Sequence, residues 1–237
     1  MNGEQLIENS KSFLNYVVKW KTDLPSLPIT EIVKGQPANV AVICVDLTNG
    51  FCYEGPLASP RVANIVDPIV TLFQKSHQAG VQNFILPQDT HLEDAVEFAN
   101  FPAHCVRGTA ESETVDKVRH LPFADNFLVL PKNSINSAMG TDLEPWLNAH
   151  PQVNTFLTVG DCTDLCVYQL AMYLKLQANA RNRPSRVIVP VDCVDTYDMP
   201  VAVAQQVGAV PHVGDLTHYI FLYHMMLNGV EVVAKID

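Results

Sequence analysis

Short apolar runs alternate along this chain with longer segments whose apolar residues recur at helical spacing, and this alternation constrains the fold more than any other feature. Six runs have the length and composition of buried strands. They are residues 39–45, 82–86, 126–130, 154–159, 186–191 and 230–234. The first contains AVICV and is almost continuously apolar, as expected of a strand that is covered on both faces.

The segments between these runs predict helices. Between the first two runs, apolar residues follow helical spacing, and Pro60 and Gly80 provide the start and stop signals. These apolar residues are Val62, Ile65, Val66, Ile69, Leu72 and Phe73. After the fourth run, one helix face is marked by Val167, Leu170, Ala171 and Leu174. Strands that alternate with helices imply right-handed crossovers, so the sequence predicts a three-layer α/β/α sandwich around a mostly parallel sheet of about six strands.

The length of 237 residues fits one large domain. We expect residues 38–237 to form it, and residues 1–37 to add a helix and a proline-bearing linker, LPSLP, packed against it. Hydrophobic residues make up 48% of the chain and charged residues 17%, which is enough apolar material to cover both faces of a sheet.

The net charge of −10 argues against nucleic acid and against anionic membrane surfaces, because both select for basic faces. No run approaches the roughly 18 apolar residues of a membrane span. The six cysteines form no Cys-x-x-Cys pair, and we expect free thiols in a soluble cytoplasmic protein. The loop DLTNGF after the first run matches neither of the glycine motifs that bind nucleotides.

Four of the predicted strands end in side chains that can perform chemistry. Asp46 follows the first run, and Asp89 and His91 follow the second. Lys132 follows the third, and Cys166 lies in the segment GDCTDLC after the fourth. In open α/β sheets, ligands bind outside the carboxyl ends of the strands. We therefore expect these side chains to meet at one edge of the sheet and to form the functional site.

Cys166 is the candidate nucleophile. Thr163 or Asp164 is a suitable N-cap for the helix that follows, which places Cys166 in its first turn. The positive end of a helix favours the thiolate, so we expect a pKa below the ordinary value of about 8.5. A cysteine at a helix start is more often a packing residue, but the polar residues predicted at the same edge favour the nucleophile.

Asp46 and Lys132 support the cysteine in this hypothesis. Asp46 takes the thiol proton and passes it to a leaving amine, while Lys132 pairs with Asp46 and stabilises the thiolate. The plainer interpretation of either residue is a solvated charge at a strand end. The sequence shows no evident Cys–His triad, although eight histidines leave one open.

Asp89, His91 and His104 are candidate metal ligands. Asp-x-His at a strand end puts two ligands on one side of an extended chain, and a histidine from the following loop completes a three-ligand site. Such a site keeps positions open for water or substrate. Because Asp-x-His is short and common, surface histidines in a polar loop are the alternative. The other six histidines are interpreted as structural or solvated.

These motifs resemble, in their order along the chain, those of the nicotinamidase/isochorismatase-like cysteine hydrolases. GDCTDLCV resembles the nucleophile loop of that family, VICVDLTNGF the first strand with its catalytic acid, and VLPKNS the lysine strand. DTH followed by FPAHCVRGT resembles the metal-binding segment of the nicotinamidase branch. The resemblance covers residues 40–196 and implies the isochorismatase-like hydrolase fold.

The resemblance also implies a role for each matching catalytic residue. Cys166 is the nucleophile, Asp46 the general base and acid, and Lys132 the electrostatic support. The backbone N–H groups of Cys162 and Cys166 form the oxyanion hole. A cis peptide bond is expected between Asp161 and Cys162.

Other matching positions concern the metal and the substrate. Asp89, His91 and His104 would hold one divalent metal ion, zinc by preference and iron or manganese as alternatives, which orients a pyridine nitrogen. The family further implies a small-molecule amide substrate and a homo-oligomer.

Phe51 and Phe101 match aromatic residues of the ring pocket, and Phe101 replaces the usual tryptophan. Asn136 stands where many nicotinamidases place a tyrosine, and Thr48 where the family often has glutamine. These departures predict a pocket that is more polar on one wall.

The resulting hypothesis is a metal-assisted cysteine amidohydrolase that releases ammonia from a small carboxamide, nicotinamide first. The nearest alternative is the same machinery acting on another amide or an N-carbamoyl or ureido compound. Vinyl-ether hydrolysis of the isochorismate type uses this fold without the cysteine, so Cys166 counts against it. A catalytically silent binding homologue is a further alternative, but the complete set of catalytic residues argues against it.

Overall fold

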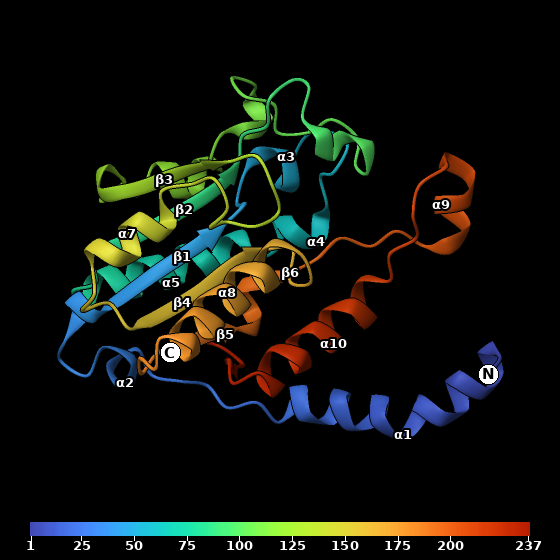
Figure 1. The fold of residues 1–237 in the computed structure, drawn as a ribbon, viewed down its shortest axis with the longest axis horizontal. Helices are drawn as coiled ribbons and strands as arrows, with labels where there is room; N and C mark the ends of the chain where they lie inside the picture. Colours follow the sequence, from blue (N-terminus) through green and yellow to red (C-terminus); the bar gives the residue numbers. More distant parts are fainter.

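A seven-stranded parallel sheet organises the computed structural model, which describes residues 1–237 (Figure 1). The strands are β1 (Val40–Val45), β2 (Asn83–Asp89), β3 (Phe127–Lys132), β4 (Thr155–Asp161), β5 (Arg186–Pro190), β6 (Val194–Asp195) and β7 (Glu231–Val233). Six of them correspond to the six predicted runs. The seventh, β6, has only two residues, which is too short for a pattern of apolar residues to announce it.

The α-helices lie between the strands and at both ends of the chain (Figure 1). They are α1 (Gly3–Thr22), α2 (Ile29–Val33), α3 (Asn49–Cys52), α4 (Pro60–Ala63), α5 (Val66–Gln78), α6 (Asp116–Arg119), α7 (Leu143–Ala149), α8 (Cys166–Ala180), α9 (Val201–Val207) and α10 (Gly214–Leu227). Five short 3₁₀ turns complete the secondary structure: η1 (Pro37–Asn39), η2 (Val96–Ala99), η3 (Ala110–Ser112), η4 (Ala124–Asn126) and η5 (Val191–Cys193).

The strand order is β3-β2-β1-β4-β5-β7, with β6 beside β4. The chain therefore builds outward from β1 in one direction through β2 and β3, and then returns to start again at β4 on the other side. Such a reversal is a topological switch point, where the connections leave a crevice at the carboxyl ends of the two central strands. In this chain the switch point lies between the ends of β1 and β4.

Gly160 allows β1 and β4 to approach closely at that point. The two strands pair in register from Val40 with Thr155 to Val45 with Gly160. Gly160 has a φ of +113°, and a Cβ added to it would lie 1.9 Å from the carbonyl oxygen of Val45. Only glycine fits this backbone position.

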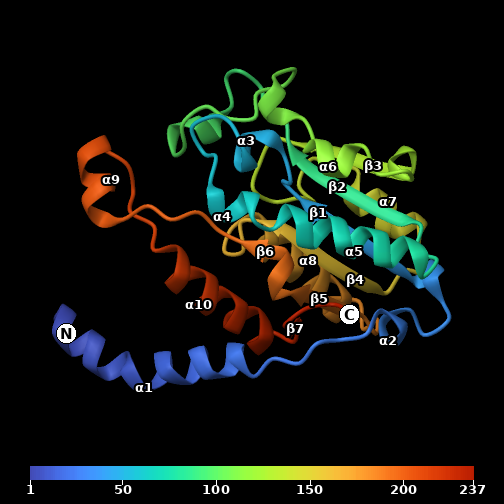
Figure 2. The same cartoon turned by 180° about the vertical axis from the view of Figure 1, so that it is seen from behind.

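Two apolar clusters lie on the two faces of the sheet, as the prediction of a three-layer sandwich requires. Alternate residues of β1 point to opposite sides, with Val42 in one cluster and Ile43 in the other. The first cluster joins the sheet to α4, α5 and α6, and the second joins it to α7, α8 and α10. Figure 2 shows α5 across the face that is hidden in Figure 1. The predicted fold class is confirmed.

The helix predicted from Pro60 to Gly80 is interrupted, and α4 and α5 are separate helices. The interruption lies at Asn64 and Ile65, four and three residues before Pro68. A proline has no N–H for the carbonyl four residues earlier and its ring clashes with that carbonyl, so a helix cannot run continuously from Asn64 through Pro68. The prediction overlooked this residue.

The N-terminal helix α1 lies beside α10 (Figure 1). Its Phe13, Tyr16 and Trp20 rings surround Tyr223 of α10 in edge-on contacts with centroid distances of 5.3, 6.0 and 5.4 Å. Val17 is the one α1 residue that is fully buried. None of the helices combines the length and apolarity that a membrane crossing needs.

Candidate active site

Three side chains from separate elements meet at the carboxyl edge of the sheet. Asp46 follows β1, Lys132 ends β3 and Cys166 begins α8. The Lys132 Nζ lies 2.8 Å from Asp46 Oδ2 and 3.7 Å from the Cys166 sulfur. All three are buried. The structure thus brings together the three residues that the sequence singled out as a catalytic group.

Asp46 is held in place by the backbone of β2. Its φ of +57° lies in the left-handed region, which aspartate tolerates better than most residues. Its N–H donates to the carbonyl of Pro87 at 2.9 Å, and its Oδ1 accepts the N–H of Asp89 at 2.8 Å. The carboxylate therefore has one oxygen fixed by the backbone and the other directed at Lys132.

The charges of the cluster do not balance, because Asp46 and Asp89 both face the single ammonium of Lys132. Burial and the charge of Asp89 raise the pKa of Asp46 to about 6, although Lys132 opposes the shift. Burial alone would lower the pKa of Lys132, but Asp46 and Asp89 raise it well above its ordinary value. Lys132 is therefore a fixed positive charge at neutral pH.

The Cys166 thiol is protonated in the resting site, which corrects the prediction of a lowered pKa. Burial is the main reason that its pKa rises well above the ordinary value; Lys132 opposes this shift, and the carboxylates of Asp46 and Asp89 add to it. An ionised thiol would add a second uncompensated negative charge to a dry site. The thiol can become a nucleophile only if its proton moves to a neighbouring base as it reacts.

The N-cap prediction for α8 is also wrong. Leu165 occupies the cap position, and no side chain caps the helix. The Thr163 hydroxyl makes a hydrogen bond with His218 instead, and Asp164 pairs with His212. Their side chains are taken by residues about 50 positions later in the chain.

The backbone of residues 161–166 presents two unpaired amides. The N–H groups of Cys162 and Cys166 donate to no other protein group, whereas the N–H of Thr163 donates to the carbonyl of Asp195 at 2.9 Å. The peptide bond between Asp161 and Cys162 is cis, as predicted. Two free N–H groups beside a thiol are the arrangement that an oxyanion hole needs.

Asp89, His91 and His104 also converge. The Nε2 atoms of the histidines face the Asp89 carboxylate, at 3.4 Å from His91 and 3.7 Å from His104. Each Nδ1–H donates to an oxygen, of Asn133 at 3.2 Å for His91 and of Pro102 at 2.8 Å for His104. These bonds leave the lone pair of each Nε2 directed at the site, as in metal-binding histidines.

The three ligand atoms lie within 4.8 Å of one another, and His91 Nε2 is buried with no hydrogen-bond partner. Burial alone would raise the pKa of Asp89, but Lys132 and the two histidines lower it below its usual range, so the carboxylate is ionised. A carboxylate and two imidazoles are suitable ligands for zinc, iron or manganese. The residues present therefore fit a divalent metal ion.

A narrow, mostly apolar cavity opens above these groups. Its lining includes Phe51 and Phe101, the two aromatic residues expected in a ring pocket. The other lining residues are Asp46, Leu57, Val62, Asp89, Glu97, His104, Ile135, Asp161, Cys162, Leu165, Cys166 and Tyr197.

Asn136 does not line this cavity, which corrects the prediction of a polar wall there. Its Oδ1 accepts the N–H groups of Ala138 and Met139 at 2.9 and 3.2 Å, because a short amide side chain readily closes a turn on its own backbone. The neighbouring Ile135 lines the cavity instead. Thr48 is also outside, with its hydroxyl 3.6 Å from the Cys105 sulfur.

Sequence reasoning missed three polar residues of the cavity: Glu97, Asp161 and Tyr197. Asp161 lies inside the GDCTDLC segment and has a buried oxygen without a partner, so its position beside the cysteine was a usable signal. Glu97 in η2 and Tyr197 after β6 come from loops that no pattern links to the strand ends.

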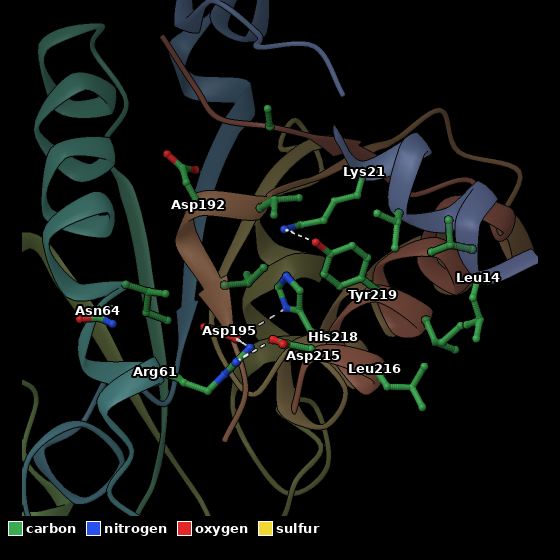
Figure 3. A pocket seen from close by; sticks show the side chains of 17 residues that line it. Leu14, Lys21, Arg61, Asn64, Asp192, Asp195, Asp215, Leu216, His218 and Tyr219 are labelled. Carbon is green, nitrogen blue, oxygen red and sulfur yellow. Dashed lines mark hydrogen bonds and ion pairs between the residues drawn. The ribbon is translucent and has the colours of Figure 1, made fainter. Parts of the chain in front are cut away.

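A larger cleft of about 860 Å³ lies elsewhere, between α1, α4, β6 and α10 (Figure 3). Three of its charged side chains, Arg61, Asp195 and Asp215, pair with one another. Arg61 reaches Asp195 and Asp215, both at 2.8 Å, and donates to the carbonyl of Thr196. Size therefore does not mark the reactive site in this molecule.

Comparisons with known proteins agree with this geometry. The Isochorismatase domain family matches residues 40–212. Nicotinamidase 1 of Arabidopsis thaliana is 29% identical over 236 residues, which cover 89% of this chain and 93% of that protein.

Two solved structures share the fold. A nicotinamidase from Bacillus subtilis is 25% identical with a TM-score of 0.63, and the match covers 82% of this chain and 99% of that one. A pyrazinamidase of Pyrococcus horikoshii in complex with zinc is 20% identical with a TM-score of 0.64, over 82% of this chain and 98% of that one. These findings confirm the predicted class of enzyme, a hydrolase that acts on C–N bonds. The family match spans most of the chain, and the chain belongs to the isochorismatase family.

Proposed function

We propose that this protein is a metal-assisted cysteine amidohydrolase that releases ammonia from a small neutral carboxamide, with nicotinamide as its substrate. One observation carries the proposal. The buried Cys166 thiol shares a cavity with a candidate base, Asp46, and lies beside two unpaired backbone N–H groups. A nucleophile, a base and oxyanion donors are the parts that acyl transfer requires.

In the first half-reaction the Cys166 sulfur attacks the carboxamide carbon while the thiol proton moves to Asp46. The carbonyl oxygen becomes an oxyanion that accepts hydrogen bonds from the N–H groups of Cys162 and Cys166. Lys132 keeps its proton and stabilises the thiolate as it forms. Asp46 then gives its proton to the departing nitrogen, the C–N bond breaks, and ammonia leaves a thioester on Cys166.

The second half-reaction reverses these roles. A water molecule attacks the thioester carbon and Asp46 takes its proton. The oxyanion forms again at the same two N–H groups, and the C–S bond breaks. Asp46 returns the proton to the sulfur, which restores the neutral thiol and releases the carboxylic acid.

Asp89, His91 and His104 would hold the metal ion. When bound, a divalent ion there supplies an electrophilic position that orients the substrate. Phe51 and Phe101 line the cavity and offer aromatic surface to a planar ring. The pyridine ring of nicotinamide has both the flat apolar faces and the nitrogen that such a site would select.

The charge of the cavity favours a neutral substrate. Asp46, Asp89, Glu97 and Asp161 line it, and no lysine or arginine does. A substrate that carries its own carboxylate, such as an N-carbamoyl amino acid, would meet these acids without a cationic side chain on the wall. This observation favours nicotinamide over the ureido alternative.

Ammonia release from nicotinamide by the zinc-loaded protein tests the proposal, with Cys166→Ala and metal-stripped protein as comparisons. We expect release by the loaded native protein alone. Release that survives loss of Cys166 would overturn the nucleophile. Hydrolysis of N-carbamoylsarcosine in preference to nicotinamide would overturn the substrate while keeping the machinery.

A further inference from the structure

Two segments far apart in the sequence meet beside the candidate oxyanion hole. The nucleophile loop, residues 161–166, lies between β4 and α8, and the later segment, residues 195–218, runs from β6 through α9 into α10. The N–H of Thr163 donates to the carbonyl of Asp195 at 2.9 Å. Two histidines of the later segment add side-chain contacts to the same loop.

His218 contacts the loop through Thr163. Its Nδ1 lies 2.9 Å from the Thr163 hydroxyl oxygen, and the ring is 5% exposed. Burial is the main reason that its pKa falls to about 4, so the ring is neutral at pH 7. Figure 3 shows the ring among the side chains that line the cleft, next to Asp195. Arg61 fixes this arrangement, because it binds Asp195 in β6 and Asp215 at the start of α10.

His212 contacts the loop through Asp164. Its Nε2 lies 2.6 Å from Asp164 Oδ2, and its Nδ1–H donates to the carbonyl of Tyr197 at 2.8 Å. The His212 ring also stacks on the Tyr197 ring, with centroids 4.1 Å apart and planes at 15°. Since Tyr197 lines the active-site cavity, His212 supports both the loop and one wall of the pocket.

The contacted residues lie between the two amides of the candidate oxyanion hole. Thr163 and Asp164 follow Cys162 and precede Cys166, so the conformation at these two positions determines where both N–H groups point. Their side chains do not cap α8, and the loop has no other side-chain partner at these two residues. The histidines are therefore the side chains that hold this turn, in addition to its backbone hydrogen bonds.

We propose that His218 and His212 are positioning residues of the oxyanion hole, His218 through Thr163 and His212 through Asp164, with His212 also orienting Tyr197 against the substrate. This inference rests on the proposed function. Neither histidine touches the reacting atoms. Small displacements of catalytic donors can lower the rate roughly 100-fold, so residues that only hold those donors in place can have large effects on the rate.

The two histidines have different expected signatures. His218 acts on the loop alone, so its loss lowers kcat and leaves KM nearly unchanged. His212 supports the loop and Tyr197, so its loss lowers kcat and also raises KM. A purely structural role for either residue would lower thermal stability and the amount of active protein without this division.

Conservative variants make the test specific, because asparagine places a polar atom near the Nδ1 position of histidine and glutamine near the Nε2 position. For His218, whose Nδ1 makes the contact, we expect His218→Gln to lower kcat roughly 10- to 100-fold and His218→Asn to recover most of it. For His212, whose Nε2 makes the contact, we expect His212→Gln to be the better variant and His212→Asn the worse. Thr163→Val should match His218→Gln, and the double variant should lose no more than either.

The rates are measured on the zinc-loaded full chain with nicotinamide and, separately, with p-nitrophenyl acetate, an activated ester that reports thiol attack on any carbonyl. Failure with nicotinamide but Cys166-dependent hydrolysis of the ester would overturn the substrate and still test the two histidines. Equal effects of glutamine and asparagine at position 218, or additive effects of Thr163→Val and His218→Gln, would overturn the positioning role.

Discussion

The two hollows of this molecule differ in how their charges are arranged. At the active site, Asp46 and Asp89 both face the buried Lys132, and His91 Nε2 and Asp161 Oδ1 are buried without partners. The cleft beside α1 is larger, at about 860 Å³, and its Arg61 pairs with Asp195 and Asp215, whose side chains are 23% and 80% exposed (Figure 3). The larger hollow therefore contains a partly exposed cation in ion pairs, whereas the smaller one lies beside buried polar atoms that have no partner.

The difference shows which feature identifies a reactive site. A buried polar group without a partner costs folding free energy, about 1–3 kcal/mol for a neutral group and more for a charge. Such groups persist when a ligand, a metal ion or a reaction uses them. Substitutions should therefore affect catalysis strongly in the cavity and weakly in the cleft, where His218 is the exception because it contacts Thr163 of the nucleophile loop. The following experiments test that contrast.

The largest effect is expected from Cys166→Ala. Without the sulfur no thioester can form, so ammonia release should fall by roughly 10⁴-fold or more. Steady-state rates with nicotinamide measure it. Cys193→Ala is the matched control, because Cys193 is equally buried but lies in η5 outside the cavity. A similar loss of activity in both variants would indicate damage to folding and not removal of a nucleophile.

Removal of one metal ligand should have the next largest effect. His104→Ala deletes one of three ligands, so bound zinc per chain should fall to near zero and ammonia release by roughly 100-fold or more. Elemental analysis of the dialysed protein gives the zinc content per chain independently of activity. His150→Ala is the control, since that ring stacks on Trp146 in another part of the fold. Full zinc content in His104→Ala would contradict the assignment of this ligand.

The same contrast explains how far the sequence could predict the structure. The sequence predicted β1 to β5 and β7 from their apolar runs. It also predicted that the residues at the ends of β1 to β4 would meet, because strand ends of a parallel sheet share one edge. The break at Asn64 was predictable from Pro68 and was missed. The protonated state of Cys166 was not predictable, because it depends first on how deeply the folded chain buries the thiol and then on the charges placed around it.

Contacts between distant loops carry no signal in a single sequence. His212 and His218 were interpreted as structural or solvated residues, and their partners Asp164 and Thr163 lie 48 and 55 positions away. The prediction for Asn136 was wrong for a related reason. A loop side chain points where its turn directs it, and the turn at Asn136 uses the amide for its own backbone.

His218 lines the larger cleft and contacts the nucleophile loop, and its contribution should be measurable in the pH dependence of stability. Its pKa is about 4 in the folded protein against 6.5 for an ordinary histidine, so the unfolded state binds more protons between these values. Stability from this group is therefore complete above pH 6.5 and is lost as the pH falls toward 4. Between pH 7 and pH 5 the loss should be about 2 kcal/mol.

Urea unfolding of the native protein and of His218→Asn at both pH values measures this contribution. The charged groups near the ring are the same in both proteins, so the difference between the two proteins isolates the imidazole. These groups are Asp195, Lys21, Arg61 and Asp164. The native protein should lose about 2 kcal/mol more than the variant. Equal losses would mean that the ring can take up a proton where it lies.

The smallest effect is expected from Asp215→Asn in the cleft. The Asp215 side chain is 80% exposed, and Arg61 keeps its bonds to Asp195 and to the carbonyl of Thr196 when the charge is removed. Exposed ion pairs contribute little, so the free energy of unfolding should change by less than about 0.5 kcal/mol, and kcat/KM should stay within roughly twofold of the native value. Urea unfolding and ammonia release measure the two quantities. Asp195→Asn is the variant to compare with it. Asp195 is 23% exposed and binds both Arg61 and the N–H of Thr196, so its substitution should lower the free energy of unfolding more than that of Asp215. A tenfold loss of activity from Asp215→Asn would show that paired charges in the larger cleft also serve catalysis, and buried imbalance would then cease to distinguish the two hollows.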